Sequence, residues 1–355
     1  MATQAQPTQP QQYTHLAPDY RLVVDGKDIS AKVQPRLISL TLTEGRENNA
    51  DQLDLELDDS DGQLAIPRQE AVIELAIGWK GQQLVDKGSF VVDEAEHSGA
   101  PDRITIRARS ADLGGEIRTR QEKSWHDTTL GAVLADIAKR NSLTHKVDPA
   151  LAAIKIAHID QTNESDMHFL TRLARQYDAV ATVKKKHLLF LPVNGTKTSK
   201  GESLPAVAIT RADGDSHRWA SSTRDAFEGV RAWWSDRVNG SRKSVIAGKK
   251  GNNLKTLKET YTSEAAALEA AKAELQRLER GAATFELTLA MGRPEITAQT
   301  PITVQGFKPE IDGQGWLVKE VTHTLGDSGW TTKAVMERGG AQGDVESNYR
   351  ATQVI

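Results

Sequence analysis

The first third of the chain alternates apolar and polar residues in short segments separated by turns. Residues 53–58 read Leu-Asp-Leu-Glu-Leu-Asp, which is the pattern of a strand with one buried and one wet face. Similar apolar segments lie at residues 20–24, 37–42, 72–77, 90–92 and 104–108. Turn residues such as Asp58-Asp59-Ser60-Asp61-Gly62 separate them, and no helical period intervenes. The pattern predicts a small antiparallel barrel or sandwich over residues 19–118.

Residues 162–192 predict a helix followed by a β-hairpin. We expect Asn163 to cap the helix and Asp166 to complete a capping box. One helical face carries Met167, Leu170, Leu173, Ala174 and Tyr177, and the outward face carries Arg172 and Arg175. Apolar runs at 180–183 and 188–191 flank the turn Lys184-Lys185-Lys186, and they predict two paired strands that the helix covers.

A second helix is predicted just before this stretch, after Trp125. Asp127 or Thr128 can cap it, and Asn141-Ser142 ends it. Its apolar face consists of Leu130, Val133, Leu134, Ile137 and Ala138. The two helices and the hairpin predict an α+β domain over residues 119–195, followed by a Gly/Ser/Thr/Lys linker at 196–204.

Strand patterns return after this linker. They lie at residues 207–210, 229–234, 285–291, 302–306, 316–325 and 330–336. Thr262 or Ser263 can cap a long helix that Gly281 ends, with Leu268, Ala271, Leu275 and Leu278 along one face. The predicted fold class is β-rich α+β, with a second β-barrel over 205–338 interrupted by a helical insertion at 236–282. Residues 1–18 predict a disordered or arm-like tail, and residues 339–355 predict a C-terminal tail.

Composition limits the possible functions. A chain of 355 residues exceeds the size of a single core, so several domains are expected. A net charge of −3 gives no general reason to bind nucleic acid or an anionic membrane. The chain has no cysteine, which excludes disulfides and thiolate sites. The apolar runs are too short for membrane anchoring, and residues 1–18 lack the pattern of a secretory signal.

Candidate catalytic and metal patterns are incomplete. Asp59, Asp61 and Gly62 imitate a calcium loop, but Leu57 and Arg68 would then occupy two ligand positions. Glu164 and Asp166 form a conceivable glycosidase pair, although capping of a helix already explains both. The nine histidines show no metal-ligand spacing beside a carboxylate. We therefore expect no enzymatic activity, no cofactor and no bound metal.

The best candidates for partner contacts lie in the predicted insertion and just before it. Trp233 and Trp234 are adjacent, so their rings face opposite sides of a strand, and tryptophan is enriched at binding hot spots. Residues 241–255 form a basic segment rich in glycine and asparagine, which we interpret as a loop that orders on assembly. Its candidate contact residues are Arg242, Lys243, Lys249 and Lys250.

The chain resembles a known family in the order of its motifs. The helix and hairpin carry Glu164-Ser165-Asp166, Phe169-Leu170, Arg172-Leu173-Ala174 and Leu188–Phe190. The first β region carries ELDDSDG, then G-W, GSF-VVDE and R-ITIRARSAD. With two β regions flanking an α+β unit, residues 20–338 resemble the hub proteins of contractile phage tails, the phage late control gene D protein family. That family is related to the N-terminal region of type VI secretion spike proteins.

The resemblance implies a structural hub at the tail tip of a phage or a phage-tail-like bacteriocin, assembled in the bacterial cytoplasm. It implies a homotrimer in which two barrels of similar fold, repeated three times, match a hexameric tail tube to a trimeric spike. The implied partners are the spike, the tube, other baseplate proteins and the tape-measure protein. We also expect the polar face of residues 53–58 to line a central channel whose acidic residues repel DNA.

Two alternatives stay open at this point. Residues 125–143 also look like the helix of a LysM-type module, so the chain could be a baseplate protein that binds or cleaves peptidoglycan. A type VI secretion spike is the other alternative. Such spikes continue into a long β-helix, whereas this sequence ends at Ile355, which favours a separate spike chain.

Overall fold

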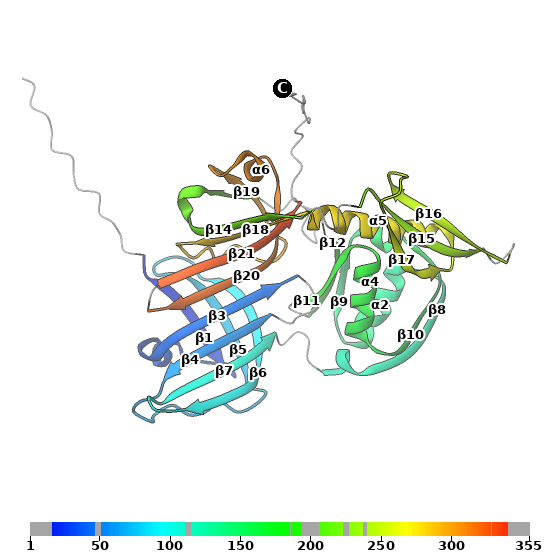
Figure 1. The fold of residues 1–355 in the computed structure, drawn as a ribbon. Coiled ribbons are helices and arrows are strands. Elements are labelled where there is room, and N and C mark those ends of the chain that lie inside the picture. Colours follow the sequence, from blue (N-terminus) through cyan, green and yellow to red (C-terminus); the bar gives the residue numbers. More distant parts are fainter. Residues whose placement is uncertain are drawn as a thin grey trace, which may run out of the picture.

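The structure, a computed structural model, describes residues 16–46, 51–110, 115–184, 186–193, 206–222, 227–236, 240–327 and 329–339. The predicted linker at 196–204 and most of both predicted tails lie outside these residues. Two β units pack side by side, and an α+β unit with an inserted sheet and helix lies beside them (Figure 1).

Both β units belong to one thirteen-stranded sheet. The first unit contains β1 (Pro18–Val24), β2 (Lys27–Asp28), α1 (Ser30–Val33), η1 (Gln34–Arg36), β3 (Leu37–Gly45), β4 (Gln52–Asp58), β5 (Val72–Trp79), β6 (Val85–Ser98) and β7 (Arg103–Ser110). The short helix η3 (Gly115–Arg118) follows, and its Ile117 packs in the core of the α+β unit. The second β unit contains β13 (Val207–Thr210), η4 (Arg211–Asp213), β14 (Gly214–Ser221), β18 (Ala283–Leu289), β19 (Pro301–Gln305), α6 (Pro309–Asp312), β20 (Trp316–Gly326) and β21 (Gly329–Arg338). The expected β-rich α+β class is confirmed.

The two units share one order of strands. The first pairs as β3-β4-β7-β6-β5-β1, and the second pairs as β14-β18-β21-β20-β19-β13. Counted along its own unit, with the two-residue strand β2 left out, each order reads second, third, sixth, fifth, fourth, first. One orientation differs, because β1 and β5 are antiparallel whereas β13 and β19 are parallel.

The predicted closed barrels are not found. No pairing among the described strands joins β3 to β1 or β14 to β13, so each unit stays open. The physical reason in the first unit is that β3 pairs with β20 of the second unit instead. The two units are therefore joined edge to edge, as the continuous row from β14 through β20 and β3 to β6 shows (Figure 1).

The apolar cores of the two units meet at this junction. Leu325 and Trp330 of the second unit pack in the core of the first. The rings of Trp79 and Trp330 lie 4.8 Å apart, and the indole of Trp79 donates a hydrogen bond to the carbonyl of Gly292 at 3.1 Å. A Cβ at position 292 would lie 1.9 Å from the indole of Trp330, so only glycine fits there.

The two helices and the hairpin predicted for the α+β unit lie close to their expected bounds, and the unit also contains elements that the sequence did not predict. It contains β8 (Arg120–Thr129), α2 (Leu130–Arg140), β9 (Thr144–Val147), α3 (Pro149–Ala152), β10 (Lys155–Ser165), α4 (Asp166–Gln176), β11 (Ala179–Lys184) and β12 (His187–Pro192). Strands β8 and β10 form one sheet, and β11, β12 and β9 form another. The predicted helices and hairpin are confirmed, and the apolar faces of α2 and α4 share one core.

The predicted caps of both helices are wrong by one or two residues. Ser165 caps α4, since its hydroxyl accepts from the amide of His168 at 3.2 Å. Thr129 caps α2 in the same way. Asn163 instead sits at a bulge of β10 with φ of 49°, and Asp166 is buried.

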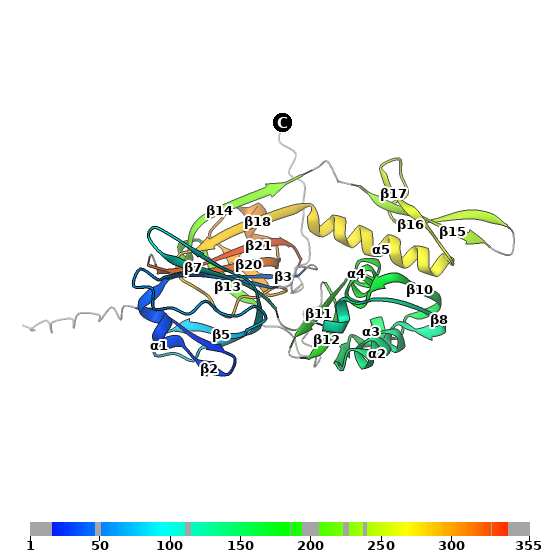
Figure 2. The same ribbon diagram turned by 90° about the horizontal axis from the view of Figure 1, so that it is seen from below.

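The insertion is larger than predicted. It contains β15 (Gly229–Asp236), β16 (Ser241–Gly248), β17 (Leu254–Tyr261) and α5 (Glu264–Gly281), with Ser263 as the helix cap. We expected residues 229–234 to belong to the second barrel, but β15 is the central strand of a separate sheet ordered β16-β15-β17. Figure 2 shows α5 running from the start of β18 toward this sheet, past α4.

Candidate functional site

The junction between the β units is an antiparallel pairing of β3 with β20. Its register runs from Gly45 opposite Glu320 to Ser39 opposite Gly326. On the apolar side it leaves Leu42 and His323 completely buried. On the polar side the hydroxyls of Thr43 and Thr322 lie 3.4 Å apart. The junction thus buries side chains from segments that lie far apart in the sequence.

A buried charge cluster lies beneath this junction. The ammonium of Lys87 on β6 lies 2.6 Å from the carboxylate of Glu44 on β3. It also lies 3.3 Å from Nε2 of His323, whose Nδ1 is 2.9 Å from the hydroxyl of Thr332. The cluster ties both units together, because each supplies at least one of its members.

The protonation of this cluster follows from burial and charge. Burial acts to raise the pKa of Glu44, but the hydrogen bond with His323 and the charge of Lys87 hold that pKa at about 2. Burial lowers the pKa of His323 below 6.5, so the imidazole is neutral at pH 7. Near neutral pH the cluster therefore contains the ion pair between Glu44 and Lys87, with a neutral imidazole beside it and the ammonium of Lys184 3.9 Å from the same carboxylate.

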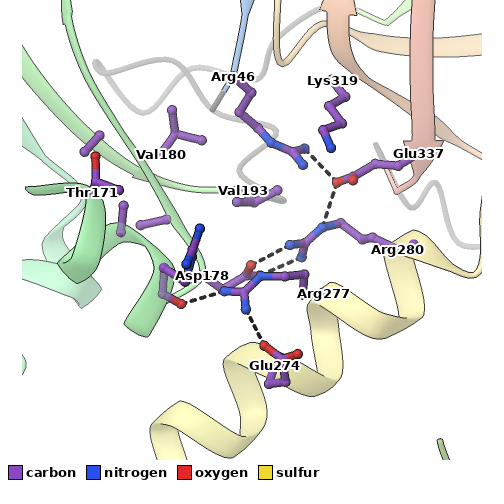
Figure 3. A pocket seen from close by; sticks show the side chains of 15 residues that line it. Arg46, Thr171, Asp178, Val180, Val193, Glu274, Arg277, Arg280, Lys319 and Glu337 are labelled. Atoms are coloured by element: carbon purple, nitrogen blue, oxygen red, sulfur yellow. Dashed lines mark hydrogen bonds and ion pairs between the residues drawn. The ribbon is translucent and has the colours of Figure 1, made fainter. Parts of the chain in front are cut away.

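A second buried network holds the α+β unit, α5 and both β units together (Figure 3). The guanidinium of Arg280 on α5 donates to Asp178 at 2.6 Å and to Glu337 on β21 at 2.9 Å. Arg46, which follows β3, donates to the same carboxylate of Glu337 at 2.6 Å. Burial opposes the charge of Arg280, but the hydrogen bond and the charge of Asp178 raise its pKa.

This network lines a cavity of about 540 Å³ between α4, α5 and the ends of the β units. The lining is dominated by paired charges, such as Arg277 with Glu274, and Arg277 also donates to the carbonyl of Arg175 at 2.6 Å. Neither buried network was found from the sequence. Their members lie far apart in the sequence, as Glu44, Lys87 and His323 do, so no local spacing signals them.

The polar face of the large sheet is not simply acidic, which corrects our expectation. Acidic residues of β4 and β6 face arginines of β7, with Glu56 2.6 Å from Arg103 and Glu94 2.8 Å from Arg107. In the second unit, Glu286 of β18 lies 3.2 Å from Arg218 of β14. Cross-strand ion pairs therefore compensate much of the charge on this face.

Several strand edges in the β units have no partner among the described residues, and two of them, on β14 and β6, belong to strands of the continuous row. Strand β14 pairs only with β18. Strand β6 pairs with β5 along residues 85–91 and with β7 along residues 90–98, so one side of residues 94–98 is unpaired. Both stretches are mostly exposed. Such edges are templates for pairing with another chain.

The predicted contact residues of the insertion lie together on its sheet. The guanidinium of Arg242 lies 4.6 Å from the ring centroid of Trp233, and the ammonium of Lys243 lies 5.6 Å from that of Trp234. Lys243 also pairs with Asp236 at 2.6 Å. Trp234 packs against the small core beneath α5, as expected for one of the two rings.

The prediction that residues 241–255 form a loop is wrong. Residues 241–248 form β16, and β17 begins at Leu254, because this segment completes the three-stranded sheet. Only the turn between these strands, which carries the exposed Lys249 and Lys250, is irregular. The cations described next to Trp233 and Trp234 are Arg242 and Lys243, not Lys249 and Lys250.

The residues considered for catalysis are engaged in structural contacts. Glu164 pairs with Arg172, and buried Asp166 pairs with Arg140. Asp61 of the calcium-like turn pairs with Arg36 at 2.5 Å. Within the described residues, no group of three or more side chains is arranged to hold a metal ion. No helix in that part of the chain is long and apolar enough to cross a membrane.

The chain belongs to the phage tail baseplate hub (GPD) family, whose model matches residues 50–329. The probable baseplate hub protein of Escherichia phage P2 is 43% identical over 361 residues, covering 91% of this chain and 93% of that protein. The probable baseplate hub protein of Escherichia phage 186 is 42% identical, with 91% and 94% covered.

Solved structures of tail proteins share the fold. The 43 kDa tail protein of prophage MuSo2 from Shewanella oneidensis aligns with a TM-score of 0.66 at 18% identity, covering 90% of this chain and 98% of that chain. The c3393 protein of Escherichia coli, described as a component of the type VI secretion system, aligns with a TM-score of 0.55 at 14% identity, covering 85% and 73%. The chain is thus a structural protein of the virion tail tip, as the family shows.

Proposed function

We propose that the chain acts as a homotrimeric hub of pseudo-six-fold symmetry between a hexameric tail tube and a trimeric spike. The observation that carries this proposal is the shared strand order of the two β units. Three chains contribute six such units, so the assembly offers six similar surfaces on one side and three identical chains on the other. The tube, the spike, other baseplate proteins and a tape-measure protein are the proposed partners.

The domains take separate roles in this proposal. Residues 19–118 and 205–338 supply the ring of six β units, which we propose to be barrel-like once assembled. The α+β domain at 119–195 and the inserted sheet lie outside that ring, because they pack beside the β units (Figure 2). The polar face of the ring, with its compensated ion pairs, lines a conduit. No enzymatic step and no cofactor is part of this function.

The insertion supplies contacts to neighbouring proteins of the particle. Trp233 and Trp234 are only partly buried, and each is paired with a cation of β16. The exposed Lys249 and Lys250 add positive charge at the tip of the neighbouring turn. We propose this sheet as a docking surface for another baseplate protein, whereas the β units make the trimer.

The experiment that tests the function is the mass of the purified protein, followed by capture of the spike protein of the same phage. Light scattering at micromolar concentration is expected to give three times the 38.8 kDa of one chain. The spike is expected to coelute with this trimer. A chain that stays monomeric and also fails to join the spike would overturn the proposal.

A further inference from the structure

The two β units match in register as well as in strand order. In the first unit, the pairing of β6 with β7 shifts between Val92 and Glu94. In the second, the pairing of β20 with β21 shifts between Val318 and Glu320. Because a bulge fixes the register of a strand, β6 and β20 occupy equivalent places, with His97 equivalent to His323.

The strands that precede the junction match in the same way. The pairing of β3 with β4 shifts between Leu37 and Ser39. The pairing of β14 with β18 shifts between Gly214 and Ser216. This match makes β14 the equivalent of β3 and places Trp219 where the first unit has Leu42.

Backbone hydrogen bonds next to β6 and β20 confirm the correspondence. Val92 accepts from the amide of Glu70 at 3.0 Å and donates to the carbonyl of Ala71 at 2.9 Å. Val318 accepts from Gln299 at 2.9 Å and donates to Thr300 at 3.1 Å. Glu70 and Gln299 both adopt a positive φ, of 63° and 74°. Such a conformation is uncommon for these residue types, so its repetition indicates one shared local structure.

The equivalence defines two junctions, of which only one is paired within the chain. Within the chain, β3 pairs with the second half of β20, at residues 320–326. The equivalent partners are β14, at one end of the large sheet, and residues 94–98 of β6, which extend beyond the pairing of β6 with β5. On those sides neither stretch has a partner among the described residues. A second copy of the chain can supply the missing strand.

We propose that β14 of one copy pairs antiparallel with residues 94–98 of β6 in the next copy. Transferring the register of the inner junction places Ala220 opposite Glu96 and Arg218 opposite Ser98. This inference deepens the proposed trimer and rests on it. Repeated head to tail, the contact is heterologous and closes after three chains, so six nearly equivalent junctions alternate within and between chains.

The exposure of equivalent residues supports the missing strand. Leu42 and His323 at the inner junction are both 0% exposed. At the equivalent outer positions Trp219 is only half-buried, and the side chain of His97 is 41% exposed. The indole nitrogen of Trp219 is buried without a hydrogen-bond partner. Trp219 lies at the edge of the core of the second unit. The equivalent residue of the first unit, Leu42, is fully buried because β20 covers it.

The charges on the two free edges are complementary. Residues 93–96 of β6 carry Asp93, Glu94 and Glu96. Asp93 and Glu94 already pair with arginines of β7, so Glu96 is the acid that matters for the next copy. On β14, the side chain of Arg218 is 73% exposed despite its pairing with Glu286. In the transferred register Arg218 is diagonal to Glu96 on the same polar face, a distance that long side chains bridge. Glu96 of one copy therefore meets the exposed Arg218 of the next.

Cysteine cross-linking tests this register, since the chain contains no cysteine of its own. The double variant Glu96→Cys/Ala220→Cys is expected to form covalent trimers on mild oxidation, and either single variant is expected to stay uncross-linked. Thr43→Cys/Thr322→Cys is the matched control, because it samples the inner junction and should cross-link within one chain. Ser98→Cys/Ala220→Cys, shifted by two residues, should cross-link poorly.

The outcomes separate this inference from the proposed function. Efficient trimers from the first variant, with poor cross-linking of the shifted one, support the pairing. Preferential cross-linking of the shifted variant overturns the register, and a trimer that neither variant cross-links overturns the strand pairing itself, while the trimeric function stands. A protein that light scattering finds monomeric, and that also fails to join the spike, contradicts the function, and the inference then fails with it.

Discussion

The inner junction pairs β3 with β20, whereas the outer edges at β14 and β6 carry the equivalent strands without a partner among the described residues. The inner pair buries Leu42 and His323 completely, whereas the outer equivalents Trp219 and His97 remain partly exposed. The difference teaches that the fold completes only one of the two junctions that its repeat defines. The completed one shows, residue by residue, what the other should look like after assembly.

The largest expected effect comes from breaking the charge cluster of the inner junction. Glu44→Leu leaves the ammonium of Lys87 buried without its carboxylate. Loss of one partner of a buried pair costs about 3–5 kcal/mol of unfolding free energy, which urea denaturation measures. The double variant Glu44→Leu/Lys87→Met removes both charges and should recover most of that loss. An equal loss in the single and the double variant would contradict the account.

Substitution of the two equivalent histidines sharpens the comparison. His323→Leu removes one buried hydrogen-bond partner each from Thr332, which still accepts from the amide of Arg293, and from the carbonyl of Ile296, at a cost of about 1–3 kcal/mol. His97→Leu should change the stability of the dissociated chain by no more than about 0.5 kcal/mol, because the site is exposed. Thermal unfolding of dilute protein measures both. Equal losses would mean that the two positions are not in different states.

Acid should weaken the inner junction in two steps. The folded pKa of His323 lies below 6.5, so the unfolded chain binds more protons as the pH falls through 6.5, and stability declines. A second decline follows between about pH 4.5 and 2, where Glu44 must be protonated. One proton changes the unfolding free energy by at most about 1.4 kcal/mol per pH unit. Between pH 7 and 5 the denaturant midpoint of His323→Leu should depend less on pH than that of the unmodified chain. An unchanged dependence would contradict the assignment of this step to His323.

The smallest effect on stability, but a clear one on association, is expected from the outer edge. Glu96→Lys places a like charge diagonal to Arg218 of the next copy, and each exposed charge contact is worth about 0.2–1 kcal/mol. Light scattering over a dilution series should show weaker trimers at low salt and recovery at high salt. Glu96→Gln is the neutral control and should lie between the two. Unchanged association in Glu96→Lys would contradict the register.

The sequence predicted the local elements well, because their signals are local. Alternating residues such as Leu53, Leu55 and Leu57 marked β4, and the apolar faces of α2 and α4 marked the core of the α+β unit. The predicted caps were wrong because several polar residues precede each helix. The backbone conformation determines that Ser165, and not Asn163, is the residue at which α4 begins.

The sequence could not predict how distant strands pair. Thr43 and Thr322 meet across 279 positions, and nothing in either strand specifies the other. The insertion was misplaced for a related reason, since β15 has the composition of any buried strand, and only its pairing with β16 and β17 separates it from the large sheet. The buried partners of Arg280 were hidden likewise, because they come from different domains.

A density map of the purified oligomer, obtained by cryo-electron microscopy, tests the central claim most directly. The account predicts three chains in a ring, with β14 of each chain hydrogen-bonded to residues 94–98 of its neighbour in the register of β3 with β20. Copies that meet through the inserted sheet or the α+β domain, with β14 and this part of β6 still facing solvent, would contradict it.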